Sequence, residues 1–286
     1  MTREVTDLID RALGEDLSVG DPTTDILIPP DLTGKAALVS REPGVLAGAE
    51  VGLAVFRRVD GELVTSALLE DGAEIGAGAR IGTVEGRVAS ILKAERTAVN
   101  FVQRLSGIAT EPSKYVAAVD GSRARIVDTR KTTPGLRLLE KRAVRAGGGQ
   151  NHRMGLFDAV LIKDNHVQSV GPPGATVRRA RSHVGDTVKV EVEIDDLAYL
   201  ESVIEAGADI VLLDNMDPQT IRAAVHHAAG RYVLEASGGI TLETVRAVAE
   251  TGVDHISVGW ITHSAPALDV ALDFVVDLSA LGRSEG

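Results

Sequence analysis

The sequence contains no cysteine, which excludes a disulfide framework, a thiolate metal site and a cysteine nucleophile. Aromatic residues make up only 3% of the 286 residues, so few side chains are available for stacking on nucleic-acid bases. Acidic residues outnumber basic ones, 41 against 30, which gives a net charge of −11. A chain of this charge is not expected to bind nucleic acid as its main role.

The chain also lacks a long apolar run and an apolar segment near its N-terminus. Its least charged long stretch covers residues 44–56, contains Glu50 and is too short to span a bilayer. Without a signal-like or membrane-spanning segment, a cytoplasmic location is the expectation. Hydrophobic residues at 44% and charged residues at 25% are typical of a globular protein, and the length favours two domains or one large barrel with an appendage.

The basic residues are concentrated in one part of the chain. Residues 123–163 hold ten basic and three acidic side chains, so this window carries +7 and the rest of the chain −18. A local concentration of positive charge on an acidic protein indicates an anion-binding site. A solvated basic helix is an equally good interpretation for Arg137, Lys141, Arg142 and Arg145.

The pattern of hydrophobic residues changes near residue 115. Before it, predicted helices and strands are mixed, and six closely spaced glycines between residues 61 and 86 indicate tight antiparallel turns. This first part therefore reads as an α+β structure. Helices are predicted over residues 5–13, 49–59 and 87–105, and strands over residues 35–40 and 62–69.

After residue 115, short β-rich runs alternate with amphipathic helical stretches, which predicts βα units and a parallel sheet. Six such units are fewer than the eight of a complete barrel, so a flavodoxin-like open sheet is the alternative. A barrel is favoured because polar side chains follow every run, and barrel enzymes draw their catalytic groups from strand ends. The runs cover residues 125–128, 159–163, 189–193, 210–214, 232–236 and 255–259.

Cationic side chains follow several of these predicted strands. Arginine binds carboxylates and phosphates with two parallel hydrogen bonds and lysine acts as a point charge, so this set predicts a substrate with several negative charges. The cationic candidates are Arg96, Arg130, Lys131, His152, Arg153 and Lys163. Glycine-rich turns that open onto helices bind phosphate on backbone N–H groups, and the candidates for this role are Ser237, Gly238, Gly239 and Gly259, with His263 nearby.

Two acidic residues, Glu193 and Asp214, end neighbouring predicted strands. They could hold a divalent cation with substrate phosphates, bind ribose hydroxyls or stabilise a cationic transition state; the alternative is that they only pair with Lys163. Lys163 could be a Schiff-base nucleophile if burial kept it neutral, but the nearby acids favour an electrostatic role. His152 could donate a hydrogen bond to substrate or lie on the surface, and His263 could reach a phosphate or cap its helix.

Most of these candidates lie in short strings, namely Ala94–Thr97, Leu105–Thr110, Asp128–Thr132, Gly147–Gly149, Asn151–Arg153, Ile162–His166, Glu191–Glu193, Leu212–Asn215 and Ser237–Ile240, with Asp21–Asp25 near the start. In order and spacing they resemble the quinolinate phosphoribosyltransferase family. The resemblance covers nearly the whole chain.

The resemblance implies the fold of a type II phosphoribosyltransferase, which is an N-terminal α/β sandwich followed by an incomplete TIM-like α/β barrel of about seven strands. The expected domains are residues 1–114 for the sandwich and 115–267 for the barrel. Residues 268–286 are expected to pack back on the sandwich as a C-terminal tail.

The resemblance also implies an activity. Quinolinate and phosphoribosyl pyrophosphate (PRPP) would react in the presence of Mg²⁺ to give nicotinate mononucleotide, pyrophosphate and CO2, a pentosyltransferase step of NAD biosynthesis. A homodimer is implied, in which Arg96 completes the quinolinate site of the neighbouring subunit.

By the same resemblance, individual residues take roles. Arg130, His152, Arg153 and Lys163 would hold the two carboxylates of quinolinate. Lys131, Glu193 and Asp214 would serve the PRPP end, the two acids holding Mg²⁺ directly or only through PRPP and water. Lys131, Lys163, Glu193 and Asp214 form the expected catalytic set, and the turns with Ser237, Gly238, Gly239, Gly259 and His263 would surround the phosphate.

Three other functions are open to these residues. A related transferase would use nicotinate or another heteroaromatic acid. An aldolase would form a Schiff base on Lys163. A non-catalytic regulator would bind PRPP without turnover.

Overall fold

The computed structural model describes residues 1–276 and consists of two compact units. The first unit contains residues 1–111, 134–147 and those from 265 onward, and the second contains residues 112–133 and 148–264. The division falls at Pro112, inside helix α4 (Val88–Ala118). The domain boundaries expected from the sequence, 1–114 and 115–267, stay a prediction; the units differ from them mainly because residues 134–147 belong with the first unit.

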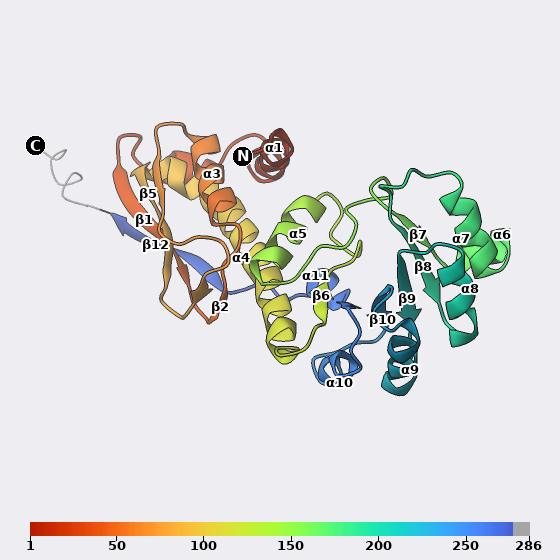
Figure 1. The fold of residues 1–286 in the computed structure, drawn as a ribbon. Coiled ribbons are helices and arrows are strands. Elements are labelled where there is room, and N and C mark those ends of the chain that lie inside the picture. Colours follow the sequence, from red (N-terminus) through yellow and green to blue (C-terminus); the bar gives the residue numbers. More distant parts are fainter. Residues whose placement is uncertain (277–286) are drawn as a thin grey trace, which may run out of the picture. The chain divides into compact units, whose positions relative to one another are not determined.

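The first unit is built on a four-stranded antiparallel sheet with the strand order β12-β1-β5-β3 (Figure 1). Strand β12 (Val270–Val276) pairs along β1 (Thr33–Ser40), so part of the expected tail returns to this unit. Residues 277–286 of that tail lie outside the described residues. The remaining strands are β3 (Val64–Ala67), β5 (Arg80–Arg87) and the separate pair β2 (Gly44–Val45) and β4 (Glu74–Ile75).

Strand β5 replaces part of the turns predicted between residues 61 and 86. Two of its glycines permit close packing and do not turn the chain. A Cβ atom on Gly82 would lie 3.0 Å from the carbonyl oxygen of Ser66, and Gly86 has a φ of +146° with its Cβ position against Leu63. Glycine inside a strand often marks such a close approach.

The helices of the first unit are α1 (Arg3–Leu17), α2 (Pro22–Leu27), α3 (Ala49–Val59), most of α4 and α5 (Arg137–Ala146). Helix α4 continues beyond the predicted end at residue 105, because the following glycine does not break it. A Cβ atom on Gly107 would overlap the carbonyl oxygen of Pro266. The glycine therefore lets the helix pack directly against the backbone that leads to β12.

The second unit is built on a six-stranded parallel sheet with the order β6-β11-β10-β9-β8-β7. Strand neighbours follow chain order, and β6 pairs with β11, which is the cyclic order of a barrel. A flavodoxin-like sheet would instead reverse its strand order at a switch point, so the flavodoxin-like alternative is wrong. The strands are β6 (Arg125–Val127), β7 (Val160–Ile162), β8 (Val190–Ile194), β9 (Ile210–Asp214), β10 (Val233–Ser237) and β11 (His255–Ser257).

The barrel is incomplete because β6 and β7 are both edge strands. Gln150 forms an isolated parallel bridge with Val127 of β6. Nearby, the Arg153 guanidinium donates from Nη1 to the carbonyl oxygen of Ala159, 3.1 Å away and just before β7. Residues 150–153 thus link the two edges of the sheet, and two predicted site residues lie in this link.

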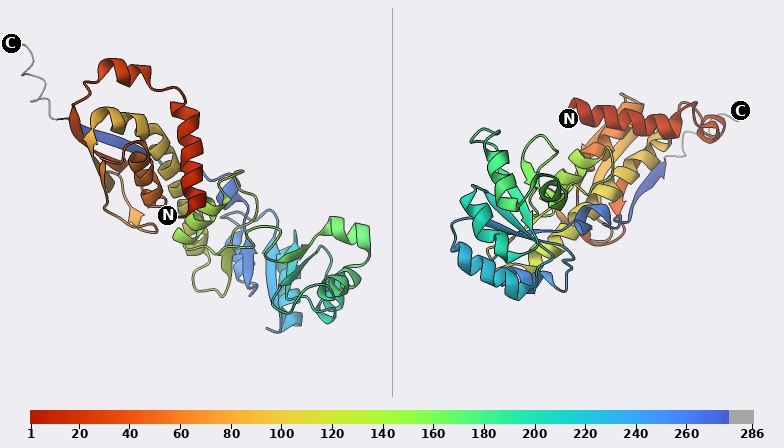
Figure 2. Two further views of the ribbon diagram at one scale, coloured as in Figure 1. Left: turned by 90° about the horizontal axis from the view of Figure 1, so that it is seen from above. Right: turned by 90° about the vertical axis from the view of Figure 1, so that its right-hand side faces the viewer.

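Helices follow most strands of the second unit; α7 packs beside β8, and α8 packs beside β9 and α7 (Figures 1 and 2). Among the described residues, no helix has both the length and the apolar composition needed to cross a membrane. The helices are α6 (Asp164–Val170), α7 (Pro173–Arg181), the 3₁₀ helix η1 (Leu197–Tyr199), α8 (Leu200–Glu205), α9 (Pro218–Ala228), α10 (Val245–Ala249) and α11 (Trp260–His263).

Candidate active site

The second unit contains a cavity of about 790 Å³, a size typical of small-molecule sites. Most of its lining comes from residues at or after the carboxyl ends of the parallel strands, where barrel enzymes place their catalytic groups. Twelve of the thirteen predicted site residues line this cavity, namely Arg130, Lys131, His152, Arg153, Lys163, Glu193, Asp214, Ser237, Gly238, Gly239, Gly259 and His263.

Lys163 and Glu193 form an ion pair within the cavity. The lysine follows β7, the glutamate lies on β8, and the Nζ–Oε2 distance is 2.8 Å. The predicted pairing of an acid with Lys163 is therefore present for Glu193. An ammonium group held by a carboxylate acts as a charge, so the geometry supports the electrostatic role of Lys163 over a Schiff-base role.

The two predicted acids lie on the same face of adjacent strands. Glu193 of β8 is paired in register with Leu212 of β9, and Asp214 is two residues further along β9. Asp214 accepts a hydrogen bond from Asn215 Nδ2 at 2.8 Å. Carboxylate oxygens at two neighbouring strand ends suit Mg²⁺, which binds one or two carboxylates together with water and substrate phosphates.

The glycine-rich turn after β10 has a conformation that requires glycine. Gly238 and Gly239 have φ angles of +95° and +59°, and a Cβ atom on Gly238 would overlap the side-chain oxygen of Asn215. The Asn215 N–H in turn donates to the carbonyl oxygen of Ser237 at 2.9 Å. Without side chains at these two positions, a phosphate can approach the backbone N–H groups.

A second close approach lies after β11. A Cβ atom on Gly259 would lie 3.1 Å from side-chain atoms of both Lys131 and His263. The Thr262 hydroxyl donates to the carbonyl oxygen of Lys131 at 2.8 Å, which ties the loop after β6 to helix α11. Glycine at this position therefore leaves room for two of the predicted site residues.

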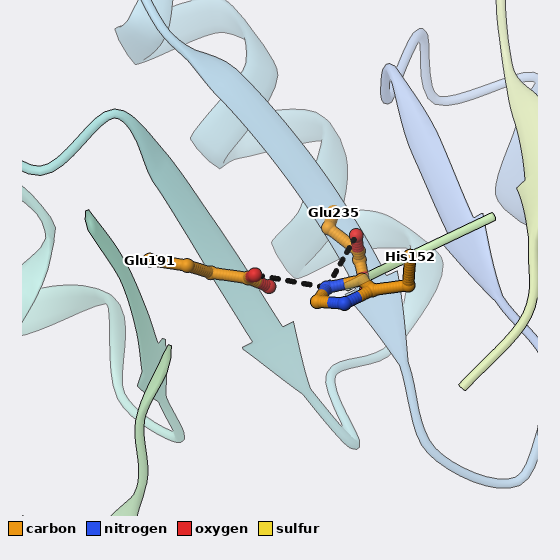
Figure 3. Close-up of side chains that lie close together, drawn as sticks. All are labelled: His152, Glu191 and Glu235. Carbon is orange, nitrogen blue, oxygen red and sulfur yellow. Dashed lines mark ion pairs between the residues drawn. The ribbon is translucent and has the colours of Figure 1, made fainter. Parts of the chain in front are cut away.

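His152 contacts two buried carboxylates that the sequence analysis did not assign to the site. Glu191 of β8 is 2% exposed and Glu235 of β10 is 1% exposed. Figure 3 shows both carboxylates directed at the same nitrogen of the His152 ring. This nitrogen, Nε2, is 2.9 Å from Glu191 and 3.8 Å from Glu235. Burial raises the pKa of Glu191; the hydrogen bond from His152 opposes this rise, and repulsion from Glu235 adds to it.

Ligand atoms of His152, Glu191 and Glu235 lie within 4.8 Å of one another, close enough for a shared metal ion. The set suits Mg²⁺ poorly, because Mg²⁺ prefers oxygen ligands and retains several waters. The direct hydrogen bond between His152 and Glu191 also occupies the space between them. Glu193 and Asp214 are the better candidates for Mg²⁺.

Arg153 and Arg130 are close enough to repel each other. Burial and the neighbouring Arg130 charge lower the pKa of Arg153, whereas Glu191 and Asp158 raise it. A bound anion would relieve this repulsion, and a planar carboxylate matches the geometry of a guanidinium group. The pair therefore suits a substrate that carries more than one carboxylate.

Arg96 is the one predicted site residue that lies elsewhere. It is an exposed residue of α4 in the first unit and lines a different cavity of about 580 Å³ beside α1. Its expected role in a neighbouring subunit stays a prediction. The cations of α5 also lie in the first unit and do not line the cavity of the second; Arg142 and Arg145 are exposed, as a solvated helix predicts, but Lys141 is buried.

The lining also includes residues that the sequence analysis missed. Glu235 is an acid in the middle of a mainly apolar strand, and this placement was the available signal, because a charged side chain is seldom buried without a function. Other missed lining residues are Thr129, Leu161, Leu212, Asn215, Ile240, Thr241, Ser257, Val258 and Trp260.

Two sequence profiles match the chain in succession. The profile of the quinolinate phosphoribosyl transferase N-terminal domain matches residues 21–106, and that of the C-terminal domain matches residues 108–273. The chain belongs to the quinolinate phosphoribosyltransferase family. The predicted family is thereby confirmed.

Relatives of this quinolinate phosphoribosyltransferase family member align over most of their length. The nicotinate-nucleotide pyrophosphorylase [carboxylating] of Mycobacterium leprae is 44% identical over 274 residues, which cover 93% of this chain and 96% of the relative. The mitochondrial quinolinate phosphoribosyltransferase [decarboxylating] 2a of Nicotiana tabacum is 38% identical over 297 residues, which cover 97% of this chain and 84% of the relative.

A solved structure confirms the predicted fold class. The nicotinate-nucleotide pyrophosphorylase of Francisella tularensis superimposes with a TM-score of 0.90 at 42% sequence identity, covering 95% of this chain and 96% of that chain. An antiparallel N-terminal sheet combined with an incomplete parallel barrel is thus the fold of this family.

Proposed function

We propose that this chain transfers the phosphoribosyl group of PRPP to quinolinate and releases nicotinate mononucleotide, pyrophosphate and CO2, as a pentosyltransferase of NAD biosynthesis. The observation that carries the proposal is the single cavity in which Arg130, Lys131, Arg153 and Lys163 meet Glu193 and Asp214. The names of the relatives, carboxylating pyrophosphorylase and decarboxylating transferase, describe the two directions of this reaction.

The quinolinate end of the site lies at the link between β6 and β7. Arg130, Arg153 and Lys163 supply positive charge for the two ring carboxylates, and His152 lies among them. Bidentate guanidinium–carboxylate pairs fix the plane of the ring. The ring nitrogen is then held in one orientation toward the ribose, which converts a bimolecular reaction into an effectively unimolecular one.

The PRPP end lies at the ends of β8 to β11. The turns at Gly238, Gly239 and Gly259 offer backbone N–H groups to a phosphate, and Lys131 lies beside Gly259. As the ring nitrogen displaces pyrophosphate, positive charge develops on the ribose, and the carboxylates of Glu193 and Asp214 stabilise it.

Decarboxylation follows from the charge on the new nucleotide. Once the ring nitrogen carries the ribose, it is cationic and stabilises the electron pair left on the adjacent carbon when the C–C bond to CO2 breaks. A proton then takes the place of the lost carboxyl group. The protein mainly positions two polyanions, and no general base is needed for these steps.

Mg²⁺ is part of the proposal. When bound, it neutralises charge on the pyrophosphate leaving group. Glu193 and Asp214 are the residues that would hold it, directly or through PRPP and water, since their oxygens lie on one face of adjacent strands.

A homodimer and a cytoplasmic location complete the proposal. Arg96 lies in the first unit on an exposed face of α4, and we assign it to the quinolinate site of a second copy. An additional guanidinium would suit a substrate with two carboxylates. Size measurement in solution and cell fractionation test these two points.

The first experiment is an endpoint assay with quinolinate, PRPP and Mg²⁺ that follows nicotinate mononucleotide and CO2, with nicotinate as a parallel substrate. Product from quinolinate alone supports the proposal. Turnover with nicotinate alone would change the substrate, and no turnover with either would leave the aldolase on Lys163 and the non-catalytic PRPP-binding regulator as the alternatives. Borohydride trapping of substrate on Lys163 would support the aldolase alternative.

A further inference from the structure

The loop that links β6 to β7 carries His152 and Arg153 into the proposed quinolinate end. Loops are usually the more mobile parts of a protein, yet a substrate clamp must hold its groups within a fraction of an ångström. If the proposed function holds, other residues must fix His152 and Arg153 in position.

Asp128 lies directly after β6 and is fully buried. Its Oδ1 accepts a hydrogen bond from the His152 backbone N–H at 2.8 Å, and its Oδ2 accepts one from Asn151 Nδ2 at 2.6 Å. Its own backbone N–H donates to the carbonyl oxygen of Gln150 at 3.0 Å. One buried residue therefore binds three consecutive residues of the loop.

The His152 ring is fixed at both of its nitrogens. Nδ1 accepts a hydrogen bond from the Arg153 backbone N–H at 2.7 Å, so the ring proton lies on Nε2. Nε2 is 2.9 Å from the buried carboxylate of Glu191. Both ring nitrogens are thus occupied by contacts within the protein, and Nδ1 holds the backbone of Arg153.

Arg153 is held from two sides as a result. Its backbone N–H binds the His152 ring, and its Nη1 donates to the carbonyl oxygen of Ala159 at 3.1 Å. The hydrogen bond to Ala159 uses only Nη1 of the Arg153 guanidinium, and Arg153 lines the cavity. Its other N–H groups project from a fixed position, as bidentate carboxylate binding requires.

We propose that Asp128 and Glu191 are positioning residues of the quinolinate site, and that His152 acts by orienting Arg153. Neither acid is offered to the substrate in this arrangement. Loss of either anchor is expected to weaken quinolinate binding while leaving the PRPP turn at Gly238 unchanged, since this turn follows another strand.

The test is a comparison of Asp128→Ala with Asp128→Asn in the full chain. Alanine removes both acceptors. Asparagine keeps one oxygen for the His152 N–H, and its amide can bind Asn151 if that side chain turns over. We expect the KM for quinolinate to rise about tenfold or more in the alanine variant, less in the asparagine variant, and the KM for PRPP to stay within about twofold.

Asp209→Ala is the matched control. Asp209 also holds a backbone N–H, that of Val190 at 2.8 Å, and lies in the same unit just before β9, at the amino end of the sheet. Loss of this residue costs stability without touching the loop of residues 150–153. A merely structural role of Asp128 would therefore make the two alanine variants alike.

An unchanged KM for quinolinate in folded Asp128→Ala, or an equal rise in both KM values, would overturn the proposal. If the alanine variant does not fold, Asp128→Asn decides alone, and an unchanged KM for quinolinate has the same meaning. The ¹⁵N NMR shifts of the His152 ring give a readout without substrate. They should show a proton on Nε2 in the wild type and a changed signal in Glu191→Ala. An unchanged signal in Glu191→Ala would contradict the anchoring of the ring, whether or not the protein turns over quinolinate. Failure to turn over quinolinate would separately refute the proposed function.

Discussion

Replacement of Gly238 by alanine is expected to disable the PRPP end of the cavity. Gly238 has a φ of +95°, and an added Cβ would overlap Asn215 Oδ1 and lie 3.0 Å from the Asn215 backbone nitrogen. The side-chain oxygen can rotate away, but the backbone nitrogen cannot, since it donates to Ser237. The turn itself must therefore move.

The size of the effect follows from two costs, the strain of a left-handed backbone and the displacement of the turn. A left-handed backbone conformation costs a residue with a Cβ about 1–2 kcal/mol, and this affects mainly stability. A shift of about 1 Å in a group that positions substrate reduces catalysis about hundredfold, equal to about 2.7 kcal/mol. We therefore expect kcat/KM for PRPP to fall about hundredfold and the dissociation constant for quinolinate to change little.

Gly121→Ala separates the two costs. Gly121 has a φ of +76°, but nothing lies within 4 Å of its Cβ position, so this variant has the backbone strain without the overlap. Steady-state kinetics with each substrate, combined with urea unfolding, compare the two variants. Wild-type kinetics in Gly238→Ala, or the same loss in both variants, would refute the reasoning.

Three further predictions concern single residues. Arg130→Ala should weaken the binding free energy of quinolinate by about 2 kcal/mol or more, as measured by calorimetry. Mixing inactive Arg96→Ala with inactive Lys131→Ala should restore activity if subunits share a site; no recovery despite subunit exchange would contradict this. The hydrogen bond from Ser90 lowers the pKa of Asp60. The ionised Asp60 therefore stabilises the fold above about pH 4, and this stabilisation is lost as the pH falls. Asp60→Asn should flatten the pH dependence of the unfolding free energy, measured by urea unfolding in acid.

The sequence predicted elements best where hydrophobic spacing was undisturbed. Helix α3 and strand β9 have the predicted bounds, Ala49–Val59 and Ile210–Asp214. Glycines caused two of the errors. Gly82 and Gly107 allow close packing inside a strand and a helix, and a close approach depends on a distant segment that local patterns cannot identify.

The candidate site was predictable because strand ends in a parallel barrel meet at one face. Residues such as Lys163 and Asp214 could therefore be grouped from their position alone. The buried acids could not be placed in the same way. The role of Glu191 depends on the His152 ring, and that ring is oriented by a loop whose conformation is set by Asp128.

The charge of the cavity agrees with the proposal that the site uses both anchored cations and a metal ion. Four basic side chains line it against three acidic ones, so the lining carries one net positive charge when every carboxylate is ionised and the histidines are neutral. Quinolinate and PRPP together bring a much larger negative charge. Fixed guanidinium groups give each carboxylate a directed partner, and the proposed Mg²⁺ would neutralise part of the remaining excess at the phosphate end. Acids that face the ribose can then stabilise its developing positive charge without repelling the substrates from the whole cavity. The charged lining residues are Arg130, Lys131, Arg153, Lys163, Glu193, Asp214 and Glu235.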